Sequence, residues 1–61
     1  MKFIDVTENG SNIIKTIATN KIKTLESFQF KSGIDGCIIY FTDKTELWVN
    51  QSKADIIKLV G

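Results

Sequence analysis

The sequence has no histidine, no arginine and no proline, and it has a single cysteine, Cys37. General acid–base catalysis near neutral pH relies most often on histidine, and a cysteine nucleophile needs a base or a positive helix end beside it. One cysteine excludes an intrachain disulfide, and without histidine it cannot complete a tetrahedral zinc site. We therefore expect a protein that is not an enzyme, with no catalytic residues, no metal and no cofactor.

All eight basic residues are lysine, and the formal net charge is +1. Arginine is the side chain that clasps phosphate with two parallel hydrogen bonds, so the composition does not favour nucleic acid or an anionic membrane as the partner. No segment approaches the roughly 18 apolar residues that span a bilayer. The first ten residues carry Asp5 and no hydrophobic run, unlike a signal peptide. A single free thiol fits a reducing compartment, and we expect a soluble, cytoplasmic protein.

A chain of 61 residues is expected to form one domain over residues 1–61. A core of this size supplies only about 3–5 kcal/mol, and small domains usually add a disulfide, a structural metal or a partner chain. Because the first two are excluded, association is the stabilising device that is left.

Alternation of apolar and polar residues predicts a first β-hairpin over residues 2–19. The Asn9-Gly10 dipeptide tolerates two positive φ values, so we expect a two-residue turn between strands at 2–7 and 12–19. One face of this hairpin would gather Ile4, Val6, Ile13 and Ile17, with Lys15 among them.

A third strand is predicted over residues 20–30, with Phe28 and Phe30 on the same face as Ile22. A helix over residues 11–27 is the alternative, because several apolar residues there also fit helical spacing. The threonine, isoleucine and asparagine content favours strands.

A second hairpin is predicted over residues 37–50. With Asp43-Lys44 as a two-residue turn, Ile39 lies opposite Trp48 and shares a face with Phe41. The other face, which we expect to lie on the core, gathers Ile38, Tyr40, Leu47 and Val49.

The face with Ile39, Phe41 and Trp48 is an apolar surface that requires a cover. Tryptophan is enriched at interface hot spots, and apolar patches of this kind mark association sites. We expect another chain to cover it; a layer from the first hairpin and a small-ligand pocket are the alternatives. A register slip of one residue would exchange the two faces of the hairpin.

The last element is predicted to be a short helix over residues 53–60. Ser52 is a good N-cap, Asp55 resembles a capping-box acid, and Gly61 ends the helix. Two helical turns are not stable alone, so the helix must pack on the sheet. The expected fold class is α+β: a small curled antiparallel sheet of four or five strands with one short C-terminal helix.

This order of elements resembles the FlbD-type small flagellar and swarming proteins. The matching residues are "ENG" in the first turn, "NKIKTLES" before the loop, and "IIYFTDKTELWVNQSKADIIKLV" to the end. The usual Asn-Gly of that family's second turn is Asp43-Lys44 here. The resemblance implies a small accessory protein without catalytic residues. The tail is also similar to LytTR-type DNA-binding domains, although this chain is shorter and lacks their loop arginines.

A second candidate site combines lysines, aromatic rings and a glycine-containing loop. Lysines interleaved with aromatics form stacking platforms for single strands, and glycine-rich backbone cradles phosphate. Lysines that protect a strand edge and an ordinary hairpin loop explain the same residues. The residues are Lys21, Lys23, Phe28, Phe30, Lys31, Gly33 and Gly36.

Together these features predict a non-catalytic interaction protein. It is expected to self-associate through the aromatic sheet face and to bind or sequester a protein partner. A module that binds nucleic acid or a nucleotide-like ligand is the alternative. Size and composition suit an accessory factor of a bacterium or a bacterial virus.

Overall fold

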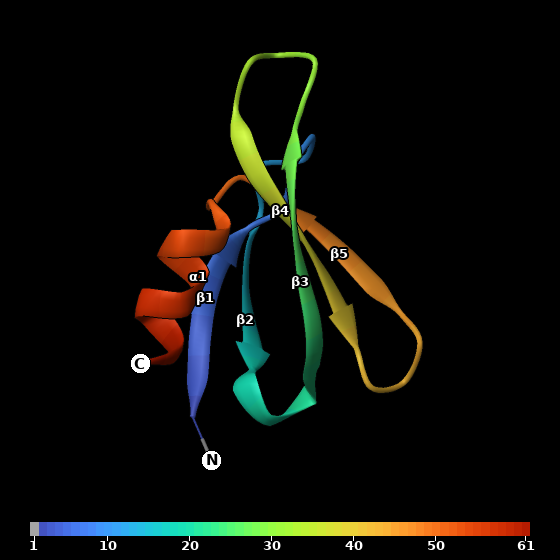
Figure 1. Cartoon of the computed structure of the whole chain (residues 1–61), viewed down its shortest axis with the longest axis vertical. Coiled ribbons are helices and arrows are strands. Elements are labelled where there is room, and N and C mark those ends of the chain that lie inside the picture. The colour runs from blue at the N-terminus through green and yellow to red at the C-terminus, as the bar shows by residue number, and fades with distance from the viewer. Residues whose placement is uncertain (1) are drawn as a thin grey trace.

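The computed structural model describes residues 2–61 as five antiparallel strands in two sheets and one C-terminal helix (Figure 1). This confirms the α+β class, although the strands are divided between two sheets and do not form one curled sheet. No helix within residues 2–61 is long and apolar enough to cross a membrane. The elements are β1 (Phe3–Thr7), β2 (Ile14–Ala18), the 3₁₀ turn η1 (Thr19–Lys21), β3 (Ile22–Gln29), β4 (Asp35–Phe41), β5 (Glu46–Val49) and α1 (Lys53–Val60).

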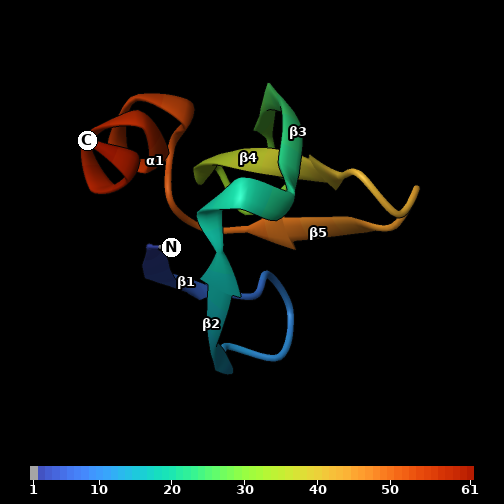
Figure 2. The ribbon, with the colours of Figure 1, turned by 90° about the horizontal axis from the view of Figure 1, so that it is seen from below.

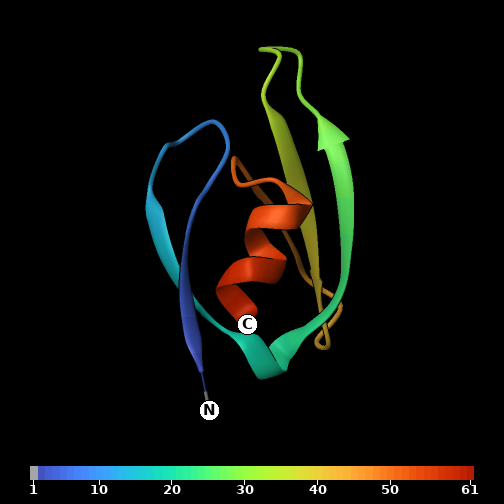
Figure 3. The same cartoon turned by 60° about the vertical axis from the view of Figure 1, so that its left-hand side comes forward.

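Strands β1 and β2 form one sheet, and β3, β4 and β5 form the other in that order. The two sheets join where the end of β1 meets the end of β5, through an isolated bridge between Glu8 and Val49. The Asn50 N–H donates to the Thr7 carbonyl at 2.9 Å at the same junction. Figures 2 and 3 show the two-stranded sheet turned away from the three-stranded one, with α1 between them.

The core lies where β1 and α1 pack on one face of the three-stranded sheet, which we call the inner face. The first hairpin and the helix therefore share this face, and neither is the separate cover that the opposite, outer face required. The fully packed cluster consists of Ile4, Val6, Cys37, Ile39, Val49 and Ile56.

The second hairpin has a three-residue turn over 42–44, and the predicted two-residue turn is wrong. The Phe41 N–H donates to the Thr45 carbonyl at 2.9 Å, and Ile38 lies opposite Trp48. Lys44 adopts a φ of 74° inside this turn. The register is therefore one residue away from the prediction, and the faces of the hairpin are exchanged as such a slip requires.

The first hairpin has a four-residue loop over 9–12, because the Glu8 N–H donates to the Ile13 carbonyl at 2.9 Å. The predicted two-residue turn is wrong here too. The register moves by two residues, so the faces of both strands stay as predicted, with Ile4 opposite Ile17. Ile13 falls into the turn region and is exposed.

Strand β3 contains an irregularity between Ile22 and Thr24. Ile22 packs against the core, as Leu25 does, whereas Phe28 lies on the outer face. The prediction that Ile22 and Phe28 share a face is wrong, because the extra residue at the irregularity exchanges the faces along the strand. The strand itself is confirmed in place of the alternative helix.

Helix α1 begins and ends as predicted. The Ser52 hydroxyl accepts from the Asp55 N–H at 3.2 Å, and the Gly61 N–H donates to the Ile57 carbonyl at 3.0 Å. Ile56 is fully buried against the inner face.

Candidate functional site

Three aromatic rings meet on the outer face of the three-stranded sheet. The ring centroids of Phe28 and Trp48 are 5.2 Å apart, and the Phe30 ring lies 5.2 Å from Phe28 and 5.8 Å from Trp48. The rings are tilted toward one another, which is a favourable aromatic geometry. We call Phe28, Phe30 and Trp48 the aromatic patch.

Gly36 makes this arrangement possible. It lies opposite Phe28 in the register, and a Cβ built on it would collide with the Phe30 ring and the Val49 carbonyl oxygen. Phe30 consequently covers the bare backbone of β4 and is only 8% exposed. Phe28 and Trp48 remain 40% and 41% exposed.

A groove of about 590 Å³ runs along the aromatic patch. Its volume lies within the range of about 300–1,000 Å³ that is usual for ligand sites. Phe28, Phe30, Ile34 and Trp48 give it an apolar wall, and Lys31 is the single charged residue among the described residues that line it. The remaining lining residues are Asn9, Gly10, Asn12, Ser32 and Asn50.

The rim amides of the groove are hydrogen-bonded to one another. The Asn9 Nδ2 donates to Asn50 Oδ1 at 2.8 Å, and the Asn50 Nδ2 donates to Asn12 Oδ1 at 3.5 Å. These bonds tie the loop of the first hairpin to the end of β5. They hold one wall of the groove in place.

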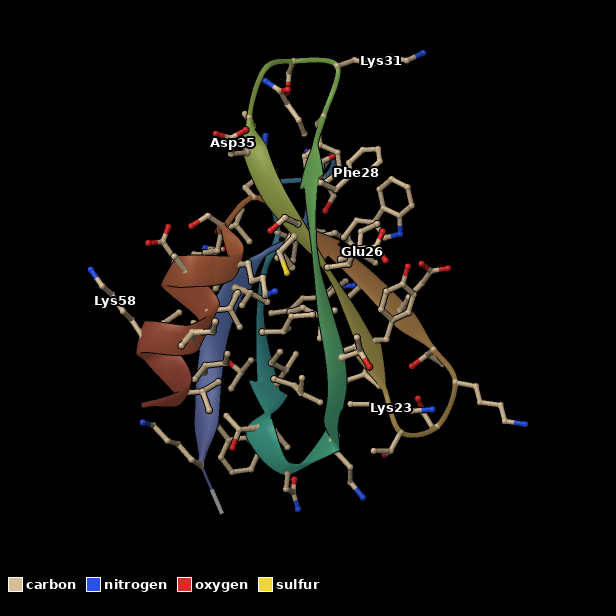
Figure 4. The ribbon with its side chains drawn as sticks, viewed as in Figure 1. Lys23, Glu26, Phe28, Lys31, Asp35 and Lys58 are labelled. Atoms are coloured by element: carbon tan, nitrogen blue, oxygen red, sulfur yellow. The ribbon has the colours of Figure 1, made fainter. Side chains whose placement is uncertain are left out.

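Two carboxylates flank the aromatic patch on the outer face. Glu46 Oε2 accepts from the Trp48 indole N–H at 3.0 Å, and Glu26 lies opposite Ile38 in the register. Desolvation raises the pKa of Tyr40 on the same face, and the charges of Glu26 and Glu46 raise it further. The surroundings of the patch are therefore acidic on one side, with Lys31 at the opposite end (Figure 4).

The structure separates the three predicted interaction residues. Ile39 is fully buried in the core, and Phe41 packs partly against the same core. The grouping of Ile39 and Phe41 with Trp48 on one face is wrong because the turn holds three residues. Trp48 lies on the outer face, where its aromatic neighbours are Phe28 and Phe30. The signal for these neighbours was their spacing of two along one strand, which puts both rings on one side.

The alternative ligand-binding residues are also divided. Phe28, Phe30 and Lys31 come together at the groove, whereas Lys23 lies at the far end of β3 (Figure 4). The carbonyl of Lys21, at that same far end, accepts from the Thr42 N–H at 2.9 Å.

Neither glycine of the loop is arranged to cradle a phosphate. The Gly33 N–H donates to the Phe30 carbonyl at 2.8 Å, so the turn itself uses this donor. Gly36 is buried beneath the Phe30 ring. The glycines therefore serve the hairpin and the aromatic patch.

Cys37 is fully buried in the core. Burial is the main cause that raises the pKa of its thiol above the ordinary value. A protonated, inaccessible thiol packs as a small apolar group.

Within residues 2–61, no group of three or more His, Cys, Asp or Glu side chains is arranged to hold a metal ion. No family model, curated protein or solved structure matches the chain. The proposals below therefore rest on the geometry of the aromatic patch and its surroundings.

Proposed function

We propose that the chain is a small non-catalytic interaction protein that self-associates and binds a protein partner, with the aromatic patch as its contact surface. Tryptophan and other aromatics dominate interface hot spots, and an apolar patch rimmed by polar residues is typical of protein contact sites. The resemblance to FlbD-type proteins, which implies an accessory protein, supports the same proposal.

The exposure of Trp48 is the observation that carries the proposal. Its side chain stands 41% exposed on the outer face, while α1 and the first hairpin, among the described residues, both pack on the inner face. A second chain on the outer face would bury the indole and the neighbouring Phe28 ring. Burial of large apolar side chains stabilises association by about 1.5–3 kcal/mol each.

The test is the solution mass of the wild type and of Trp48→Glu at micromolar concentration, measured by light scattering after size exclusion. We expect a dimer or a larger assembly for the wild type and a monomer for the variant, because burying an unpaired charge costs several kcal/mol. Trp48 is already part-exposed, so the variant is expected to stay folded, which circular dichroism checks.

Ile14→Glu is the matched control. Ile14 is 68% exposed on β2, which is not one of the strands of the aromatic patch, so the same charge is expected to leave the assembly intact. A monomeric wild type, or equal dissociation of both variants, would contradict the proposal.

The gathering of Phe28, Phe30 and Lys31 at the groove favours a second candidate, a nucleotide-like or single-stranded nucleic-acid ligand. Bases stack on exposed rings, and Lys31 would meet a phosphate. Glu26 and Glu46 beside the patch oppose such a ligand. Quenching of Trp48 fluorescence by a short single-stranded DNA at low and high salt separates the two candidates, because phosphate-driven binding weakens steeply with salt.

A further inference from the structure

Strand β3 has a free edge. It is the first strand of its sheet and pairs only with β4 within residues 2–61, and Figure 3 shows it along the outer border of the molecule. The edge at β5 is closed differently, because the Asn9 N–H donates to the Trp48 carbonyl at 2.8 Å. Unpaired backbone on an edge strand is a template for another strand.

Hydrogen bonding in the loop after β3 identifies which groups face outward. The Phe30 N–H donates to the Ile34 carbonyl, and the Phe30 carbonyl accepts from the Gly33 N–H, so both groups of Phe30 point toward the β4 side. Backbone groups alternate along an antiparallel strand. The N–H and C=O groups of Leu25, Ser27 and Gln29 therefore point away from β4 and form the free edge.

We propose that a second copy of the chain docks on this edge, with β3 antiparallel to β3 about a two-fold axis at Ser27. This pairing uses the whole regular stretch of the strand between the irregularity at Ile22/Thr24 and the turn at Phe30. It sets Glu26 opposite Phe28 of the second copy. A pairing centred on Glu26 would instead set two carboxylates directly opposite each other, which is destabilising.

The self-association part of the proposed function is what this pairing rests on, and the edge gives it a geometry. A patch that is consumed by self-association cannot hold another protein at the same time. A two-fold axis perpendicular to the sheet joins the two three-stranded sheets into one of six strands. Both aromatic patches then lie on the same outer face, open to a protein partner.

Proline substitution tests the edge without breaking the existing sheet. Ser27→Pro removes an outward N–H and leaves the hydrogen bonds between β3 and β4 in place. We expect the dimer of the wild type to become a monomer with unchanged circular dichroism. Thr16→Pro is the matched control, because the bonds of Ile13 and Thr19 to β1 direct the Thr16 N–H to the free edge of β2. This control is expected to remain a dimer.

Cysteine scanning tests the register and does not depend on proline. Ser27→Cys would face its own copy across the two-fold axis at about 5 Å between Cα atoms, a spacing that permits a disulfide. Gln29→Cys would lie about 14 Å from its copy, four residues along the strand. The native Cys37 is buried and does not compete. We expect oxidised dimers on a non-reducing gel for Ser27→Cys and not for Gln29→Cys; equal cross-linking, or none, would overturn the register.

The outcomes separate this pairing from the proposed role of the aromatic patch. Dissociation of Ser27→Pro together with cross-linking of Ser27→Cys supports the edge, whatever Trp48→Glu does. An assembly that survives Ser27→Pro and is lost in Trp48→Glu overturns the edge and leaves the patch as the contact. A monomeric wild type overturns both.

Discussion

The rings of Phe28 and Trp48 lie 5.2 Å apart, although strand β4 separates the two strands that carry them. Neighbouring strands are about 4.8 Å apart, so the two backbones are about 10 Å from each other. The rings approach across β4 where Gly36 offers no side chain between them. A missing side chain on the central strand thus creates the aromatic patch.

Gly36→Ala is expected to lower the free energy of unfolding by about 1–3 kcal/mol, because the added methyl would overlap the Phe30 ring and backbone of β5. Displacement of the Phe30 ring should also shift the emission of Trp48, which packs against it. Denaturant unfolding and fluorescence measure the two effects.

Gly33→Ala is the control for that change. Its φ of 87° makes any side chain unfavourable, but an added Cβ would meet no atom within 4 Å. We expect a loss of about 1 kcal/mol with an unchanged emission of Trp48. A Gly36→Ala variant with wild-type stability and emission would contradict the role of Gly36 in the patch.

Cys37 is predicted to react with a thiol reagent only after unfolding. Full burial blocks access, and the raised pKa of the thiol reduces the reactive thiolate at neutral pH. The rate of labelling in buffer should be at least about 100-fold below the rate in denaturant, since it requires opening of the core. Complete labelling of the native protein within the mixing time would disprove the burial of this residue.

The charge of Glu8 is predicted to stabilise the first hairpin above its titration range. The Ser11 hydroxyl bond and then the Lys15 ammonium, at 3.0 Å, hold the pKa of Glu8 below its ordinary value of 4.5. A lowered folded-state pKa gives stability that is present above 4.5 and is lost as the pH falls through the folded value. Urea midpoints of the wild type and Glu8→Gln should therefore differ at neutral pH and converge in acid.

High salt offers a check on the Glu8 prediction. The pair with Lys15 is exposed, so salt should reduce the difference between the two proteins at neutral pH. A difference that grows as the pH is lowered would contradict the assignment.

The sequence was sufficient to predict the strands and the helix because their signals are local. β-branched residues alternate along each strand, and Ser52 and Gly61 mark the two ends of α1. Turn lengths were not predicted, since they depend on how a few polar residues settle in three dimensions. In the second turn, Asp43 Oδ1 accepts from both the N–H and the hydroxyl of Thr45.

The candidate site was predicted only in part for the same reason. Trp48 was correctly singled out as an exposed aromatic, but one residue in the turn decided whether Ile39 or Ile38 stood beside it. The meeting of Phe28 and Phe30 with Trp48 depends on strand order and on Gly36. Neither feature can be read from the spacing within a single strand.

The backbone at Lys44 is predicted to control the register of the second hairpin. Its φ of 74° lies in the left-handed region, which glycine adopts freely and which a β-branched side chain resists. We expect Lys44→Gly to be about 1–2 kcal/mol more stable than Lys44→Val in denaturant unfolding, with wild type between them. Thr42 is the control position, because it lies outside the left-handed residues of the described chain; there, glycine should be the less stable substitution. Equal stability of glycine and valine at position 44 would mean that the turn has two residues, which would return Ile39 to the side of Trp48.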